Sequence, residues 1–236
     1  MLTQGMYKQL AALLLVAGIS DAELTRNIQK QISNLDYGSG RPVVTVKGGV
    51  VSIEGTVASL WLKEETINRI LKVQGIESVM SDVTIAKAES DAKLAEAVIK
   101  AVRGYSLYTV YDDFQGRVVN GSVYISGAVT EPKKINDVVE RIAKIKGVQA
   151  IDNKVVVLPP SQEDDRIRVQ VAQAIYRQPE FERYSMADPP VHVIVNKGRV
   201  TLSGALRADI EKRKALEAAR FVPGILSVDD KIQLVK

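Results

Sequence analysis

The segment "VVSIEGTV", residues 50–57, alternates like a β-strand but carries a glycine where its inner face should have a large apolar side chain. Val51, Ile53 and Val57 lie on one face of this strand, and Gly55 lies on the same face. A glycine inside a strand costs stability, and it marks either a bulge or a close approach of another backbone. Gly55 therefore needs a structural explanation.

The same strand pattern occurs twice more, as "SVYISGAV" at residues 122–129 and "RVTLSGAL" at residues 199–206. Each strand glycine has a second glycine six residues before it and a third glycine 20 residues after it. The three sets are Gly49, Gly55 and Gly75; Gly121, Gly127 and Gly147; and Gly198, Gly204 and Gly224. This agreement indicates a threefold internal repeat with a period of about 70 to 77 residues.

Each repeat begins with an amphipathic helix, in which apolar residues recur at a spacing of four. A hairpin follows, and Asn120-Gly121 is the dipeptide preferred in a two-residue type I′ turn. A second amphipathic helix comes next, and we expect Gly75, Gly147 and Gly224 to end it in the left-handed conformation. The predicted fold is α+β: three tandem αββαβ sandwich domains, each with two helices packed on a three-stranded sheet.

In this fold we interpret Gly55, Gly127 and Gly204 as structural glycines. Either a helix backbone approaches the sheet at these positions, or the strand bulges there before it turns into the second helix.

The three domains are expected at residues 21–88, 89–160 and 161–236, after an apolar N-terminal segment at residues 1–20. In that segment Lys8 precedes an apolar run from Leu10 to Ile19. Ten apolar residues are too few to span a bilayer as a helix, but they suit the hydrophobic region of a signal peptide. We expect an export signal or, alternatively, a retained segment that docks on a partner or in a membrane interface.

The composition, 46% hydrophobic and 25% charged, is that of a globular protein. The net charge of +4 is spread so that no repeat exceeds +2, which argues against nucleic acid as a partner. There is no cysteine and a single histidine, His192, which alternation places on the outer face of a strand. The carboxylates at residues 163–165 open a helix, where acids favour the positive end of the dipole. We therefore expect no catalytic, metal-binding or cofactor-binding residues, and no enzyme.

The order of elements, with a glycine in the second strand and another after the second helix, resembles the BON domain of bacterial osmotically inducible and nodulation proteins. The resemblance covers residues 21–236 as three tandem copies. It implies a protein of the periplasm or cell envelope of a bacterium, one that binds phospholipid surfaces or supports envelope integrity under osmotic stress. The implied partners are an anionic phospholipid surface or envelope proteins. The same order is similar to the ring-building domains of secretion systems, so the alternative is a homo-oligomer whose domains stack into a ring or filament.

Three exterior surfaces are candidates for membrane or partner contact. They are the apolar turn Leu60, Trp61 and Leu62; the aromatic loops with Tyr105, Tyr108 and Tyr111 and with Phe181 and Tyr184; and the basic run Lys212, Arg213 and Lys214. One helical turn cannot bury three large apolar side chains on a single face, aromatic side chains suit interfaces, and basic side chains attract anionic lipid. The alternatives are that these aromatic side chains cover the chain's own core and that the basic run is a solvated face.

Overall fold

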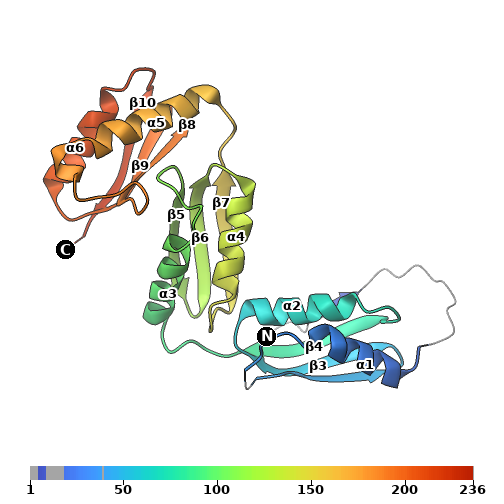
Figure 1. The fold of residues 1–236 in the computed structure, drawn as a ribbon. Helices are drawn as coiled ribbons and strands as arrows, with labels where there is room; N and C mark the ends of the chain where they lie inside the picture. The colour runs from blue at the N-terminus through green and yellow to red at the C-terminus, as the bar shows by residue number, and fades with distance from the viewer. Residues whose placement is uncertain (1–4, 9–18, 39, 236) are drawn as a thin grey trace. The chain divides into compact units, whose positions relative to one another are not determined.

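The computed structural model describes residues 5–8, 19–38 and 40–235, and within them lie three repeats of two helices and a sheet (Figure 1). The first repeat consists of α1 (Asp21–Ile32), β2 (Val43–Lys47), β3 (Val50–Val57), α2 (Leu60–Leu71) and β4 (Ser78–Ile85). The second consists of α3 (Asp91–Arg103), β5 (Asp113–Val119), β6 (Ser122–Val129), α4 (Pro132–Ala143) and β7 (Ala150–Val157). The third consists of α5 (Gln162–Tyr176), the 3-10 helix η1 (Pro179–Phe181), β8 (Val191–Asn196), β9 (Arg199–Leu206), α6 (Asp209–Arg220) and β10 (Ser227–Leu234). The predicted α+β fold of three αββαβ repeats is confirmed.

The middle strand of each repeat is the centre of its sheet, flanked by the other two strands. In the first and third repeats the hairpin strands are antiparallel, with Val46 opposite Val51 and Val195 opposite Val200. The last strand runs parallel to the middle one, as Val51 opposite Val79 shows. Parallel neighbours need a crossover connection, and the second helix of each repeat provides it.

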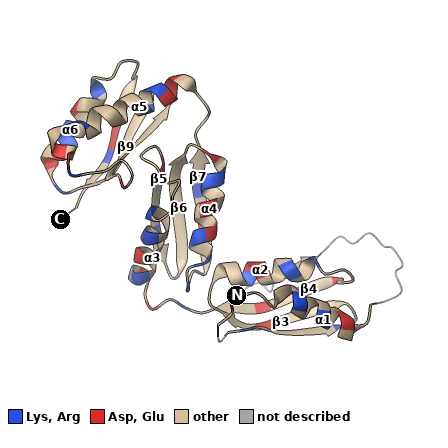
Figure 2. Cartoon of the chain, in the orientation of Figure 1, with Lys and Arg blue, Asp and Glu red and all other residues tan. Residues whose placement is uncertain are grey.

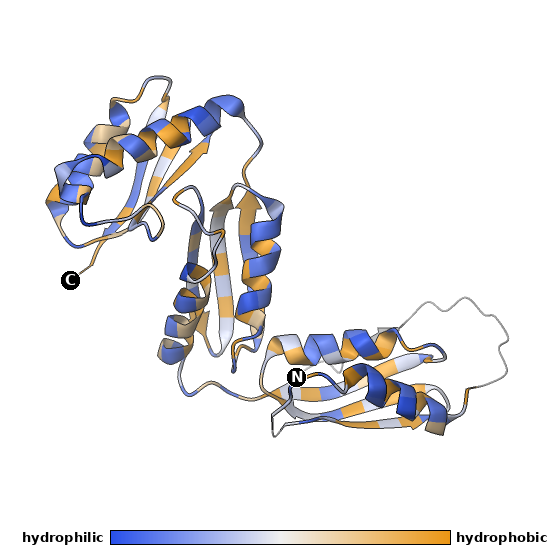
Figure 3. Ribbon diagram, in the orientation of Figure 1, coloured by the Kyte–Doolittle hydropathy of each residue, from blue (hydrophilic) through white to orange (hydrophobic). Residues whose placement is uncertain are grey.

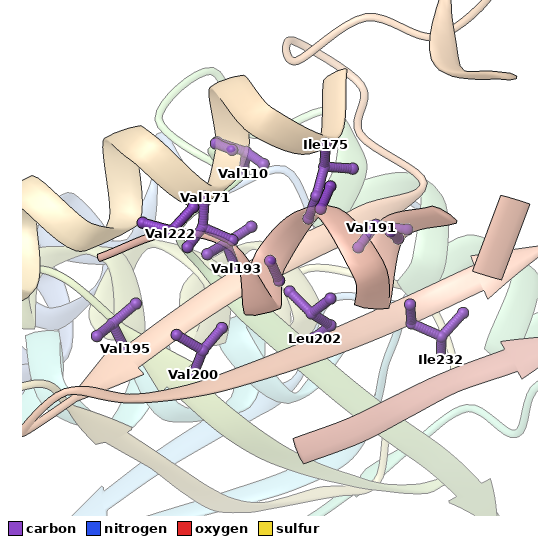
Figure 4. Close-up of a cluster of buried hydrophobic side chains, with 14 of the residues drawn as sticks. Val110, Val171, Ile175, Val191, Val193, Val195, Val200, Leu202, Val222 and Ile232 are labelled. Atoms are coloured by element: carbon purple, nitrogen blue, oxygen red, sulfur yellow. The ribbon is translucent and has the colours of Figure 1, made fainter. Parts of the chain in front are cut away.

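Apolar and polar residues alternate along the strands and divide the faces of the helices (Figure 3). In the first repeat Leu24, Ile28 and Ile32 form the buried stripe of α1. The core of the third repeat includes Val171 and Ile175 of α5 with residues of β8, β9 and β10 (Figure 4). Each repeat thus buries the apolar faces of its elements between two helices and a sheet.

The backbone that approaches the strand glycines belongs to the neighbouring hairpin strand and not to a helix. Gly204 has a φ of 120° and lies opposite Val191, and a Cβ built on it would lie 2.1 Å from the carbonyl oxygen of Pro190. Gly127 has a φ of 131°, and a Cβ there would lie 2.0 Å from the carbonyl oxygen of Asp113. A side chain would collide with the start of the first hairpin strand at both positions.

The second helix of each repeat ends one turn earlier than the later glycine of its set. Helices α2, α4 and α6 end at Leu71, Ala143 and Arg220, whereas Gly75, Gly147 and Gly224 lie in the following turns with φ of 90°, 93° and 88°. The expected positive φ is present, but these glycines do not cap the helices. Hydrogen bonds from the N–H of residue i+3 to the carbonyl of residue i, such as that from Val73 N–H to the Ile70 carbonyl, continue the helical turns beyond the end of the α-helix.

Strand β1 (Gly5–Lys8) pairs antiparallel with β4 and adds a fourth strand to the first sheet. Residues 1–4 and 9–18 lie outside the described residues, so the predicted signal peptide or retained apolar segment at residues 1–20 falls mainly outside the description. Among the helices of the described ranges, none combines the length and the hydropathy that crossing a bilayer requires.

The chain divides into two compact units, with the boundary inside the second repeat. One unit comprises Met1–Ala97, Val118–Val123 and Ile142–Ile151, and the other comprises Val98–Arg117, Tyr124–Arg141 and Asp152–Lys236. Each unit contains contacts between successive repeats, which are described separately below.

Candidate functional site

The apolar turn at the start of α2 is shared between the core of the first repeat and a contact with the second repeat. Leu62 is buried, and Leu60 and Trp61 are partly buried. The Lys144 Nζ lies 4.8 Å from the centroid of the Trp61 ring, which is a cation–π distance. Only part of this turn is therefore left for an outside partner.

The aromatic side chains of the two long loops contact the chain itself. Phe181 is fully buried in the third core, and Tyr105 is buried with its hydroxyl donating to Asp137 over 2.6 Å. Tyr111 is half-buried against the third core. The hydroxyl of Tyr184 donates to Glu211 over 3.2 Å. Tyr108 contacts the third repeat at His192. These contacts favour the alternative that the aromatic side chains cover the chain's own surfaces.

Each member of the basic run on α6 has a carboxylate partner. Lys212 pairs with Asp230 at 2.8 Å, Arg213 with Asp209 at 3.0 Å, and Lys214 with Glu217 at 2.9 Å. Lys and Arg positions are mixed with Asp and Glu positions along the helices (Figure 2). Because each charge is paired, the basic run produces little net positive field.

A more exposed apolar surface lies between α6 and β10, at residues 221–226, which we call the third tip. Phe221 is 81% exposed and Leu226 is 75% exposed, the two highest values among the large apolar side chains of the described residues. Phe221 lies one residue beyond α6, and Leu226 lies one residue before β10. Exposed large apolar side chains gathered at one loop require an explanation, whereas scattered ones do not.

The equivalent loops of the other two repeats are polar where the third tip is apolar. Three positions of the loop are compared. The first repeat has Lys72, Gln74 and Glu77 there, and the second has Lys144, Lys146 and Gln149. The third has Phe221, Pro223 and Leu226. Aligning the three repeats on their last glycines is enough to find this difference. The shared glycines and apolar stripes of the repeats do not reveal this difference, because it lies at positions between them.

Three exposed cations surround the third tip: Lys197, Arg199 and Arg220. Arg220 directly precedes Phe221, and Arg199 is the register partner of Ser227, the residue after Leu226. None of the three side chains has an ion-pair partner in the part of the chain that the structure describes. Their positive charge is therefore available to an outside anion, in contrast to that of Lys212, Arg213 and Lys214.

An aspartate in the first helix holds the hairpin turn in the third repeat. The carboxylate of Asp164 is buried and accepts hydrogen bonds from Lys197 N–H at 2.7 Å and Gly198 N–H at 2.8 Å. The Gly198 carbonyl accepts in turn from Leu226 N–H at 2.8 Å. The third tip is thus fixed to the hairpin turn, and the turn is fixed to helix α5.

The same arrangement occurs in the other repeats. Asp21 accepts from Gly48 and Gly49, and Asp91 accepts from Asn120 and Gly121. The acids at residues 163–165 were expected to favour the positive end of the helix dipole, and that expectation did not include the bond from Asp164 to the turn. Among the described residues, no cluster of three His, Cys, Asp or Glu side chains could hold a metal ion.

Comparison with protein families identifies the repeats. The model of the BON domain matches residues 20–87, 90–159 and 163–236. The chain belongs to the BON domain family. Membership indicates an envelope-associated or structural role, and the family is not a catalytic one.

No curated protein matches the BON chain. Among solved structures, the chain is similar to the C-terminal domain of CdsD, described as the structural protein of the type III secretion system of Chlamydia trachomatis. The identity is 17%, the TM-score is 0.26, and the match covers 92% of this chain and 100% of that one. A second CdsD structure matches at 17% identity with a TM-score of 0.25, over 90% of this chain and 92% of that one.

Proposed function

We propose that this BON protein is a non-enzymatic component of the bacterial cell envelope that docks on anionic phospholipid surfaces through the third tip. The observation that carries the proposal is the exposure of Phe221 and Leu226, at 81% and 75%, beside cations without ion-pair partners. A periplasmic location, export, and support of envelope integrity under osmotic stress are parts of the same proposal.

The chemistry of the third tip matches that of an anionic membrane surface. Burying a large apolar side chain stabilises the bound state by about 1.5 to 3 kcal/mol, and Phe221 and Leu226 are exposed enough to provide most of this. A basic side chain close to an anionic leaflet contributes about 1 kcal/mol, and the tip has three such side chains. Two apolar anchors and a basic rim are together the combination that stable binding to a lipid surface needs.

Vesicle co-sedimentation of the full chain tests this proposal. We expect binding to vesicles of phosphatidylcholine mixed with phosphatidylglycerol, and weak binding to phosphatidylcholine alone. The double variant Phe221→Ala/Leu226→Ala should lose at least about tenfold in affinity, since about 1.4 kcal/mol corresponds to a factor of ten. The variant Arg199→Ala/Arg220→Ala should also bind less tightly, and its binding should depend less on salt.

The matched control is the double variant Lys72→Ala/Glu77→Ala, which changes the equivalent positions of the first repeat. It should bind lipid like the unchanged protein. Equal binding by the tip variant and the control would overturn the proposal. The alternative, assembly of the domains into a ring or filament, would be supported if the tip variant abolished self-association in light scattering while lipid binding stayed absent throughout.

A further inference from the structure

The long loop of the second repeat packs against strand β8 of the third repeat, inside one compact unit. Val193 N–H donates to the Val110 carbonyl over 2.8 Å, and the Val110 side chain is only 3% exposed. Figure 4 shows Val110 among side chains of the third core, to which it contributes as a residue of the second repeat. The loop therefore supplies both backbone and side-chain contacts to β8.

His192 lies beside Val193, and its ring contacts Tyr108 from the same loop. The Tyr108 hydroxyl is 3.0 Å from Nε2 of His192, and the two rings stack with centroids 5.0 Å apart and an interplanar angle of 27°. His192 is 7% exposed, although it occupies the outer face of its sheet. Strand alternation predicted this face, and the loop that covers it comes from another repeat.

The second ring nitrogen of His192 is buried. Nδ1 is buried and has no hydrogen-bond partner among the described residues, and the same is true of Oγ of Ser203, its register partner on β9. When the ring is neutral and carries its proton on Nε2, Nδ1 has no hydrogen. The ring then has no hydrogen-bond donor without a partner at Nδ1. Protonation would place a positive charge at this buried position, which is costly even with the backbone of Thr109 nearby as an acceptor.

The charged groups near His192 are Asp113, Asp112 and Arg103. Asp112 is fully buried and already engaged by Lys134 Nζ at 2.8 Å and by Thr109 and Thr130, and Asp113 accepts from Gln115. Both carboxylates therefore already bind groups other than His192. Burial lowers the pKa of His192, and it outweighs the opposing effects of Asp113, of the Thr109 backbone and of Asp112.

We propose that His192 makes the contact between the second-repeat loop and β8 acid-sensitive, so that protonation of its ring releases the loop from the strand. This inference is independent of the proposed lipid binding. When the contact is closed, the ring binds a proton less readily than in the open form, where its pKa is near the ordinary value of about 6.5. The closed contact is therefore fully stable above that pH, weakens as the pH falls below it, and stops weakening below the lowered pKa.

The experiment uses the untagged full chain, in which His192 is the only histidine and its NMR signals are unique. We expect the ring to titrate below the ordinary histidine value. After correction for the intrinsic rate, exchange of the Val193 amide hydrogen should be faster at pH 5 than at pH 7, because protonation of the ring favours the open form. Amides of strand β3 in the first repeat serve as the internal control and should change little.

The variant His192→Gln stays neutral over this pH range and should show a Val193 exchange ratio near one. Should this variant fail to fold, the titration of the unchanged protein decides, together with Tyr108→Ala, which removes the ring that covers His192 and should move the histidine pKa towards its ordinary value. Titration of His192 at the ordinary value, or identical pH dependence of Val193 in the variant and the unchanged protein, would overturn the inference.

Discussion

The strand glycines differ from one another in how closely another backbone approaches them. A Cβ on Gly204 would lie 2.1 Å from the Pro190 carbonyl oxygen, whereas a Cβ on Gly55 would lie 3.3 Å from the nearest atom, Cα of Pro42. Both residues have a φ that L side chains rarely adopt, 120° and 130°. Gly204 is therefore required by both conformation and space, and Gly55 is required mainly by conformation.

This difference predicts two unequal alanine substitutions. Gly55→Ala should cost about 1 to 2 kcal/mol of stability in the first repeat, the cost of placing an L residue in a disfavoured conformation. Gly204→Ala should cost about 3 kcal/mol or more in the third repeat, because the backbone must also move away from the new Cβ. Hydrogen exchange of core amides measures the stability of each repeat separately, and equal losses would contradict this account.

At the scale of elements, apolar periodicity predicted the helices and strands, and the turn dipeptides predicted the hairpins, because each depends on local periodicity and turn chemistry. The bonds from Asp21, Asp91 and Asp164 to the hairpin turns could not be predicted from spacing. The aspartate and the turn are 27 residues apart in the first repeat, 29 in the second and 33 in the third, since the intervening loops differ in length. In the folded chain the three aspartates bind equivalent positions of their hairpin turns, although their distances from those turns along the sequence differ.

The bond from Asp164 to the turn can be tested against a neighbouring acid. Asp164→Asn keeps one carbonyl oxygen but places an NH2 group opposite a backbone donor, and it should destabilise the third repeat by about 1 to 3 kcal/mol. Glu163→Gln removes an exposed pair with Arg166 and should change stability little. Urea unfolding followed by amide exchange in β8 and β9 distinguishes the two, and similar effects of both substitutions would argue against a structural role for Asp164.

At the scale of the whole molecule, the equivalent loops after the second helices have separate roles. The loop of the second repeat contacts the ends of β3 and β4 in the first, within one compact unit. Gly147 N–H donates to the Ala58 carbonyl at 3.0 Å, and Gln149 Nε2 donates to the carbonyls of Ile85 and Ala86 at 3.3 and 3.1 Å. Trp61, which the sequence marked as a candidate membrane contact, lies at this contact beside Lys144. Composition marked Trp61 as amphipathic, but which surface it faces depends on how successive repeats pack.

The first repeat has Glu77 where the second has Gln149, and a carboxylate cannot donate to a carbonyl. Gln149→Glu should therefore break the contact between the first and second repeats, since the Nε2 hydrogen bonds are lost and a negative charge faces carbonyl oxygens. At about 1 kcal/mol for each hydrogen bond, we expect the contact to weaken by about 2 to 3 kcal/mol. Exchange of the Gly147 amide hydrogen should accelerate accordingly, and proteases should cleave residues 86–90 more readily.

Glu77→Gln is the matched control, because it makes the same chemical change in reverse at an exposed position in the first repeat. It should leave Gly147 exchange and cleavage at residues 86–90 unchanged. The core amides of the first repeat should keep their protection in both variants, because the contact joins two repeats that each have their own core. A loss of core protection in Gln149→Glu would mean that the loop stabilises the fold of the first repeat itself, and unchanged Gly147 exchange would mean that Gln149 does not hold the repeats together.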